Sequence, residues 1–359
     1  MNQKPSVWIE GVGLEISWAD ATRSLTDLIF DTVRAAVDDA GRGFEGIDSV
    51  VLAAHDLVDG RSLSSMVTAP AAGAYLRDEI RYGDDSAGAF IAGMTRIESG
   101  ESERTIVAAW GRSAEHDVDA VSRALFDPVM LSGLGLDELQ IAAMNAQRWR
   151  QVGGDVSHIG AAQARRAASA QANARALATG GWRSTNSWPL EQDHLPVWAD
   201  VVAAVVISGR PSGTRVSGVG QSSEPYWPGD RKLAYAPALT AAAELALAEA
   251  GRPLSKIDVF EMDGLTLYDE AIAFEAIGLV PRGKGMEALA MDSRCNPSGG
   301  SGAGYCAPAM GLTRIVESVL QLRGTAGAVQ QGRPKMAMAS GSSLVAQQTQ
   351  SVIVMETGV

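Results

Sequence analysis

The chain has 359 residues, of which 46% are hydrophobic and 20% charged, with a formal net charge of −12. This composition predicts a globular protein with a large core, and the acidic balance excludes nucleic acid as a partner because no clustered basic face is available. Two cysteines, four scattered histidines and no long apolar run exclude a disulfide scaffold, a metal site and a membrane span, so we expect a cytoplasmic protein.

Two parts of the chain share a pattern of a helix, a glycine and a strand. Residues 35–42 form an amphipathic helix that ends at Ala-Gly, and Ile-Asp and an apolar strand follow. Residues 245–252 end at the same dipeptide, again before Ile-Asp and a strand. Gly41 and Gly251 stand where a helix takes its left-handed terminal residue.

A second pair of matching segments follows in the same order. Met-Thr-Arg-Ile at 94–97 and Leu-Thr-Arg-Ile at 312–315 each lie late in a predicted helix. Strands are predicted after them at 105–110 and 335–339. Two matches in one order predict two duplicated, packed α/β units.

The region between the repeats has little strand character. A helix is predicted at 159–179 with Arg165, Arg166 and Arg175, and a loop with Trp182, Arg183 and Trp188 follows it. The arginines form either a solvated helix face or, with the tryptophans, a site for phosphate and adenine. We therefore divide the chain into a first half-domain at 1–110, an inserted lobe at 111–195, a closing strand at 196–215 and a second domain at 216–359.

A glycine-rich segment, Asn-Pro-Ser-Gly-Gly-Ser-Gly-Ala-Gly-Tyr-Cys, occupies residues 296–306 before a predicted helix at 309–322. Glycine is retained where backbone must approach a ligand or another backbone closely. The alternative is a flexible linker, which the regular apolar pattern on both sides disfavours. The segment delivers Tyr305 and Cys306 to the start of the helix.

The duplicated halves, the inserted lobe and Asn-Pro-Ser-Gly-Gly together resemble the thiolase superfamily over essentially the whole chain, and most nearly its sterol-carrier-protein-x or lipid-transfer type. The resemblance implies an α/β fold with a five-layered α-β-α-β-α core. It implies CoA thioesters as substrates, no tightly bound cofactor, and a homodimer or a heteromer with another thiolase-like chain.

A thiolase of this type has a nucleophilic cysteine at the start of the central helix, which here is residues 86–99. The family spacing leads to Gly83, and its neighbours Asp84, Asp85 and Ser86 are the alternatives. Asp85 is either an N-terminal helix cap or a catalytic carboxylate. No cysteine is available in this region, so acyl transfer to a thiolate at this position is excluded.

The other three catalytic positions have also changed. By resemblance, Asp263 occupies the second position, Cys306 the third in place of histidine, and Ala339 the fourth, before a turn that contains Gly341. Gly299, Gly300, Gly341 and Arg183 are the expected binding residues for the acyl-CoA. If the resemblance holds, Gly83, Asp263 and Cys306 border one shared cavity.

Some relatives that also lack the nucleophile carry tyrosines at the second and third positions and cleave acyl-CoA thioesters by a retro-aldol reaction, together with a zinc-ribbon/OB-fold partner. The resemblance therefore favours a carbon–carbon lyase or acyl-transfer subunit in lipid or steroid side-chain breakdown. Asp263 is the candidate base, and Tyr305 or Cys306 the candidate donor. The alternatives are a buried, inert Cys306 and a non-catalytic acyl-CoA-binding or scaffold subunit.

Overall fold

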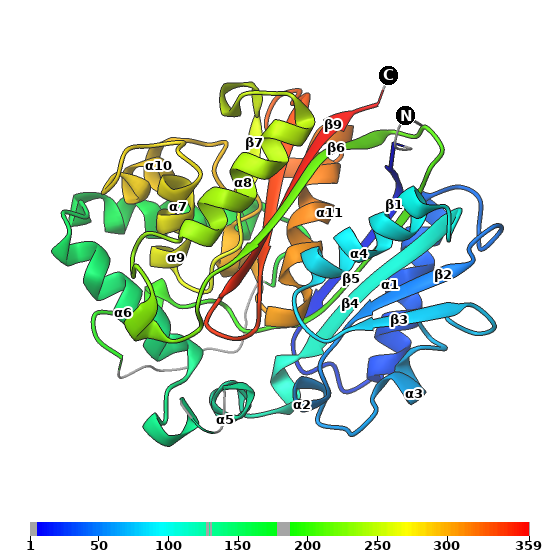
Figure 1. The fold of residues 1–359 in the computed structure, drawn as a ribbon, viewed down its shortest axis with the longest axis horizontal. Helices are drawn as coiled ribbons and strands as arrows, with labels where there is room; N and C mark the ends of the chain where they lie inside the picture. Colours follow the sequence, from blue (N-terminus) through cyan, green and yellow to red (C-terminus); the bar gives the residue numbers. More distant parts are fainter. Residues whose placement is uncertain (1–5, 127–128, 130, 178–186, 359) are drawn as a thin grey trace.

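A computed structural model describes residues 6–126, 129, 131–177 and 187–358 (Figure 1). Within these residues the strands form one mixed sheet in the order β3-β2-β4-β5-β1-β6-β9-β8-β7. The strands are β1 (Trp8–Ser17), β2 (Ser49–Ala53), β3 (Asp78–Tyr82), β4 (Arg104–Arg112), β5 (Asp200–Ser208), β6 (Thr214–Ser223), β7 (Val259–Glu261), β8 (Met336–Ser342) and β9 (Thr349–Thr357). The α-helices are α1 (Leu25–Asp39), α2 (Asp56–Asp59), α3 (Ser65–Thr68), α4 (Ser86–Ser99), α5 (Val118–Leu125), α6 (Glu138–Gln151), α7 (Ile159–Ala172), α8 (Pro237–Ala250), α9 (Leu267–Ala276), α10 (Gly285–Met291) and α11 (Met310–Arg323).

The sheet consists of two half-sheets with the same internal order. In the first, β2 pairs in parallel with β3 and β4, and β5 pairs antiparallel with β4 and β1. In the second, β7 pairs in parallel with β8, and β9 pairs antiparallel with β8 and β6. A parallel bridge from Phe260 of β7 to Cys295 lies where β3 lies in the first half. The duplication predicted from the sequence is therefore present in the strand order.

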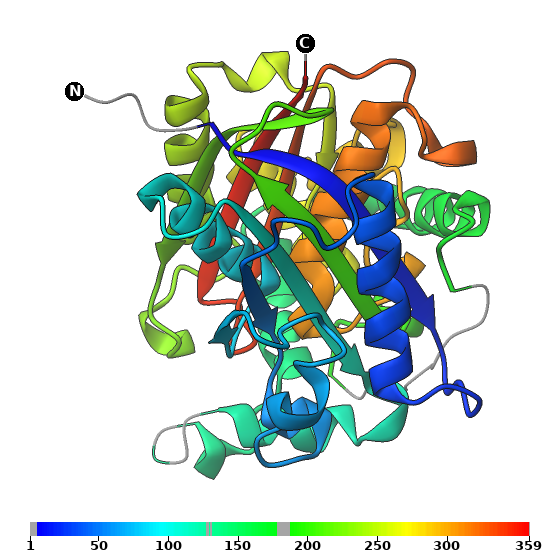
Figure 2. The same ribbon diagram turned by 90° about the vertical axis from the view of Figure 1, so that its right-hand side faces the viewer.

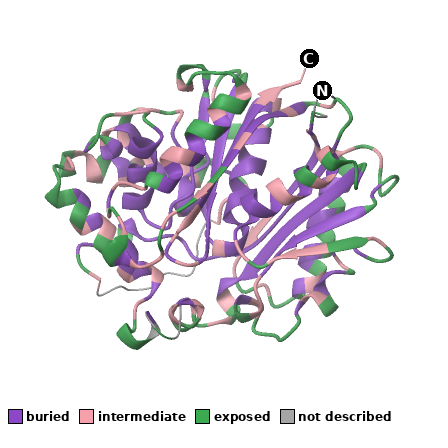
Figure 3. Ribbon diagram, viewed as in Figure 1, coloured by how far each residue is buried: buried purple, intermediate pink, exposed green. Residues whose placement is uncertain are grey.

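The two half-sheets enclose a central helical layer (Figures 1 and 2). Helices α4 and α11 pack against each other, and each contacts strands of both half-sheets. On the outer faces, α1 packs on β1 and β5, and α8 packs on β6 and β9. Each half-sheet is thus covered on both faces, and its strands are largely buried (Figure 3). This arrangement confirms the predicted five-layered α-β-α-β-α core.

Glycine pairs at equivalent places in the two halves bring the outer helices close to the sheet. Gly11 and Gly13 of β1 face α1, and Gly218 and Gly220 of β6 face α8. A Cβ atom added at Gly220 would overlap the carbonyl oxygen of Ala242 and lie 2.9 Å from the amide nitrogen of Ala246. The helix backbone therefore rests directly on the strand backbone, which no residue larger than glycine allows.

The inserted region lies mainly beside the second half. Helix α6 packs on α9, α7 packs on α10, and α5 contacts α2 of the first half. The helix predicted at 159–179 is shorter than expected, because α7 ends at Ala172. The Asn173 side chain there donates hydrogen bonds to the Ser298 carbonyl and to Glu317, which turns the chain toward the core. No helix in the described ranges has the length and apolar character needed to cross a membrane.

Candidate functional site

Asp85 stands at the start of the central helix α4. Its carboxylate accepts a hydrogen bond from the Gly88 amide at 3.2 Å, which satisfies one of the free amides of the first turn. Added Cβ atoms at Gly311 and at Gly341 would each lie 2.5 Å from Asp85 Oδ1. Gly341, an expected ligand-binding residue, therefore faces Asp85. The structure places Asp85, and not Gly83, at the N-terminal cap of α4.

Asp263 follows β7 and reaches the same central region from the second half. Its Oδ2 accepts a hydrogen bond from the Ser342 hydroxyl at 2.6 Å, and its backbone amide donates to the Ser340 hydroxyl at 2.9 Å. The residue is 6% exposed, and its Oδ1 has no hydrogen-bond partner within the described part of the chain. A buried, unsatisfied acceptor of this kind is costly and is typical of a functional group.

The carboxyls of Asp85 and Asp263 interact electrostatically. Burial raises the pKa of Asp263, and burial together with the negative charge of Asp263 raises the pKa of Asp85 well above its ordinary value. Two carboxylates that share a dry site do not both ionise readily, so one of them retains a proton. The pair therefore has the electrostatics of an acid/base site.

Tyr305 and Cys306 have different immediate neighbours. Burial and the charge of Asp263 raise the pKa of Tyr305, and its ring packs edge-to-face on Trp198 at 5.7 Å. The Cys306 thiol lies against Gly111 and the Ser113 hydroxyl, and burial raises its pKa to about 12. The charge of Asp263 therefore acts on Tyr305, whereas the raised pKa of Cys306 favours a protonated thiol at neutral pH.

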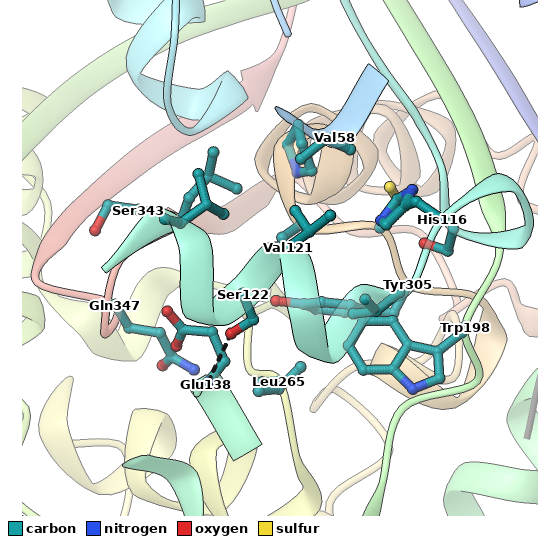
Figure 4. Close-up of a pocket in the computed structure, with 17 residues that line it drawn as sticks. Val58, His116, Val121, Ser122, Glu138, Trp198, Leu265, Tyr305, Ser343 and Gln347 are labelled. Atoms are coloured by element: carbon teal, nitrogen blue, oxygen red, sulfur yellow. Dashed lines mark hydrogen bonds between the residues drawn. The ribbon is translucent and has the colours of Figure 1, made fainter. Parts of the chain in front are cut away.

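The predicted site residues border three cavities instead of one. The inner cavity, of about 60 Å³, is lined by Tyr305 and Cys306 (Figure 4). The Asp263 cavity measures about 30 Å³. The outer cavity, of about 310 Å³, is lined by Gly83. The expectation of one shared cavity is wrong, because the loop at 343–348 between β8 and β9 contributes walls to all three.

Glu138 is a site residue that the sequence did not suggest. It begins α6 in the inserted region and lines the inner cavity together with Tyr305. Its carboxylate accepts a hydrogen bond from the Ala346 amide at 2.7 Å, and burial raises its pKa to about 8. The only local signal is the capping box that Asp137 and Gln140 form, which marks a helix start and carries no information about a cavity.

The glycine-rich segment at 296–304 packs against buried carboxylates of its own chain. Glu270 accepts hydrogen bonds from the Asn296 side chain and from the Ser301 amide and hydroxyl. An added Cβ at Gly300 would meet the Glu270 carboxylate, and one at Gly299 would meet Ala170 of α7. The backbone at Gly299 and Gly300, which we expected to approach a ligand, therefore approaches other parts of the protein.

The arginines of the inserted region also bind the protein. Arg165 donates to the carbonyls of Leu289 and Cys295. Arg166 lies 3.8 Å from Glu270, and Arg175 forms a 2.6 Å ion pair with Glu317. These three arginines are directed into the core, so both alternatives of a solvated face and a phosphate site are wrong for them. Arg183 and Trp182 lie outside the described residues.

One group of side chains in the described ranges has metal-binding spacing, and it lies away from these cavities. Asp155, His158 and Glu287 are close enough to share an ion. The Lys284 ammonium already forms ion pairs with Asp155 at 3.0 Å and Glu287 at 3.1 Å. The positive charge that the cluster requires is therefore supplied by the protein.

We expect the free energy of unfolding to decrease as the pH rises from about 4 through the folded pKa values of the buried carboxyls. Burial raises the pKa of Asp269 to about 6, and those of Asp85 and Asp263 are also raised. In this range the folded state binds more protons than the unfolded state, so raising the pH destabilises the fold. Asp85→Asn, which keeps a good capping residue, should flatten the decrease in urea unfolding measured at several pH values.

The control for this experiment is Asp27→Asn in the exposed capping box of α1. Hydrogen bonds from Ser24 lower the pKa of Asp27, so its contribution is present above its unfolded pKa and is lost on acidification. The variant should therefore change the acidic side of the stability profile in the opposite sense. An unchanged profile for Asp85→Asn would show that the pKa of the Asp85 carboxyl is not raised in the folded protein.

Comparison with known proteins agrees with this architecture. Residues 222–356 match the family described as thiolase C-terminal domain-like. The structure is similar to the Ltp2–ChsH2(DUF35) aldolase, with a TM-score of 0.79 and 20% identity over 98% of both chains. It is similar to a monomeric SCP2-thiolase-like protein type 1 from Mycobacterium smegmatis, with a TM-score of 0.69 and 18% identity over 98% of this chain and 77% of that chain. It is also similar to human mitochondrial 3-ketoacyl-CoA thiolase, with a TM-score of 0.70 and 15% identity over 98% and 99% of the two chains.

A comparison with curated proteins finds no match. The family match covers the second half of the chain, and the solved structures cover nearly all of it. Together they confirm the predicted resemblance to the thiolase superfamily: this chain has the thiolase fold, and its residues 222–356 match the thiolase C-terminal domain-like family.

Proposed function

We propose that the protein is a carbon–carbon lyase of the aldolase type that acts on acyl-CoA thioesters without a cysteine nucleophile. The observation that carries the proposal is the buried Asp263, whose Oδ1 has no hydrogen-bond partner within the described residues and whose charge raises the pKa of both Asp85 and Tyr305. A base and a hydrogen-bond donor are the groups that a retro-aldol cleavage requires.

The reaction is balanced with these groups alone. The Asp263 carboxylate takes the proton from the 3-hydroxyl group of a 3-hydroxyacyl-CoA, and the bond between C2 and C3 breaks. C3 leaves as an aldehyde or ketone, while the electron pair of the broken bond passes into the thioester as an enolate. Tyr305 donates a hydrogen bond to the enolate oxygen, and the proton that Asp263 accepted passes to C2, which gives the shortened acyl-CoA and restores the carboxylate. No oxidant or reductant is consumed.

The comparisons support this choice of reaction class. The solved structure named as an aldolase shares the fold over 98% of both chains, and its name joins two proteins. We therefore propose that this chain also works in a heteromer, with either a second thiolase-like chain or a zinc-ribbon/OB-fold protein. Tyr305 lies directly before Cys306, which holds the third family position, and Asp263 holds the second, so neither tyrosine of the lyase relatives is matched residue for residue.

A second candidate function is a non-catalytic subunit that scaffolds an active partner. The small volumes of the inner cavity and the Asp263 cavity, about 60 and 30 Å³, favour it. A scaffold leaves little room for a substrate, whereas a lyase must bind the acyl portion beside Asp263. The two candidates therefore differ in whether the 343–348 loop moves to admit a substrate.

The test is an assay of the purified chain and of its native co-purified complex with a 3-hydroxyacyl-CoA. Mass spectrometry should detect the carbonyl product and the shortened acyl-CoA. Absence of both products in both preparations would reject the lyase and leave the scaffold. Incubation with acetyl-CoA serves as the third arm, in which an acetyl adduct on Cys306 would indicate an acetyltransferase instead.

A further inference from the structure

The inner cavity has the lining of a binding site for a small apolar group. Its walls are largely aliphatic and aromatic, and they are formed by both halves of the fold and by the inserted region. Tyr305 lies beside Trp198, and its hydroxyl is directed into the cavity (Figure 4). The apolar side chains that line the cavity include Val58, Val118, Val121, Leu125, Leu265 and Leu344.

The volume of the cavity limits what it holds. At about 60 Å³ it is far smaller than a cavity of roughly 150 Å³ that accommodates benzene. It corresponds to about two water molecules at the density of the liquid, or about two or three carbon atoms. Apolar side chains supply most of the cavity wall, and Ser122, Glu138 and Tyr305 supply polar groups, so the site suits a short aliphatic group that carries a polar end.

The inner cavity and the larger outer cavity share a wall. Leu125, Ser343 and Leu344 line both the inner and the outer cavity, and Leu344 is 4% exposed. The outer cavity, at about 310 Å³, is lined by polar groups that include His55 and Asp84. An apolar partition thus stands between a polar vestibule and the apolar chamber that contains Tyr305.

The loop that carries Leu344 has a defined set of attachments. The Asp84 carboxylate accepts a hydrogen bond from the Leu344 amide at 2.8 Å, and Glu138 accepts one from the Ala346 amide at 2.7 Å. Arg231 donates to the Ala346 carbonyl. Ala346 and Gln347 have φ values of 52° and 49°, a backbone conformation that costs energy in residues other than glycine. The attachments hold the loop in this strained form.

We propose that the inner cavity is the binding site for a short aliphatic acyl group, and that Leu344 sets the chain length it accepts. The thioester end of such a group would lie beside Tyr305, a placement that rests on the proposed function. A chain longer than about three carbons would collide with Leu344 unless the loop moves. The site thus admits a short acyl group and excludes a longer one.

Binding, measured without turnover, tests this proposal. The probes are the propionyl and octanoyl thioesters of N-acetylcysteamine, which carry no CoA, and calorimetry gives their affinities for the full chain. The native protein should bind the propionyl probe at least tenfold more tightly than the octanoyl probe. Leu344→Ala should improve octanoyl binding at least tenfold, because the partition is removed.

Leu344→Val provides a milder variant if the alanine variant unfolds, and it should shift the preference in the same direction. Leu245→Ala is the matched control, since Leu245 is 53% exposed on α8 and lines none of the three cavities. Equal affinities for the two probes in the native protein, or an unchanged preference in both Leu344 variants, would overturn the proposal. Chain-length selection without any cleavage of 3-hydroxyacyl-CoA would reject the lyase and leave this binding site standing.

Discussion

Replacing Asp263 by asparagine is expected to reduce the rate of carbon–carbon cleavage by about 10²- to 10⁴-fold, the usual contribution of a positioned general base. Asparagine has nearly the same shape and still accepts the hydrogen bond from Ser342, but it cannot take a proton. The fold should be as stable or more stable, because one of two mutually repelling buried carboxyls is removed. The loss should appear in kcat measured with a 3-hydroxyacyl-CoA.

The pH dependence distinguishes a base from a structural residue. Because burial raises the pKa of Asp263, the native activity should increase with pH as that carboxyl ionises. The residual activity of the variant should lose this limb of the profile. Asp292→Asn is the control, since Asp292 pairs with Arg294 beside none of the three cavities. An Asp263→Asn enzyme with native kcat would show that another group accepts the proton.

The second large effect concerns stability. We expect Gly220→Ala to lower the free energy of unfolding by about 3 kcal/mol, at the upper end of overpacking effects. The new methyl group would overlap the carbonyl oxygen of Ala242, which belongs to the backbone of α8 and cannot rotate away. Relief of the overlap requires α8 to move off β6, which loosens the packing of Ala246 and its neighbours. Urea unfolding followed by circular dichroism measures the change.

Gly209→Ala is the matched control for this experiment. Gly209 follows β5 at the surface, and an added Cβ would make only an ordinary contact, 3.7 Å from Ile97. Its substitution should change the free energy of unfolding by less than about 0.5 kcal/mol. If both variants had the same stability, the close approach of α8 to β6 would not be the restraint that the structure indicates.

Local signals predicted much of the fold. The helix expected at 86–99 coincides with α4, because Asp85 caps its first turn and Gly100 ends it in the left-handed conformation. The strands expected at 105–110 and 335–339 lie within or overlap β4 and β8. The bounds of these elements depend on caps and apolar patterns that span only a few residues. Such local patterns can be recognised in the sequence alone. The end of α7 was missed because the Asn173 side chain forms a hydrogen bond with Glu317, which lies 144 residues away in the sequence.

The site was predicted less completely. Counting residues along the glycine-rich segment put Cys306 at the third catalytic position, and that assignment stays a prediction. The structure adds that Tyr305 and Cys306 line the inner cavity, whereas Asp263 lines another. Which cavity a side chain borders depends on the packing of distant segments, which counting along the chain does not describe. Glu138 was missed for a related reason: it enters the site from an inserted region that has no motif.

What the amino-acid sequence determined by itself is the duplicated α/β order and the absence of a thiol at the start of the central helix. Both follow from residue type and short-range pattern, which no folding step can alter. Only the tertiary structure decided that Gly299 faces α7 and Gly300 faces Glu270, and that the 343–348 loop divides the expected cavity into three. Those outcomes depend on side-chain directions and on contacts between segments far apart in the chain, where packing, not local preference, sets the lowest free energy.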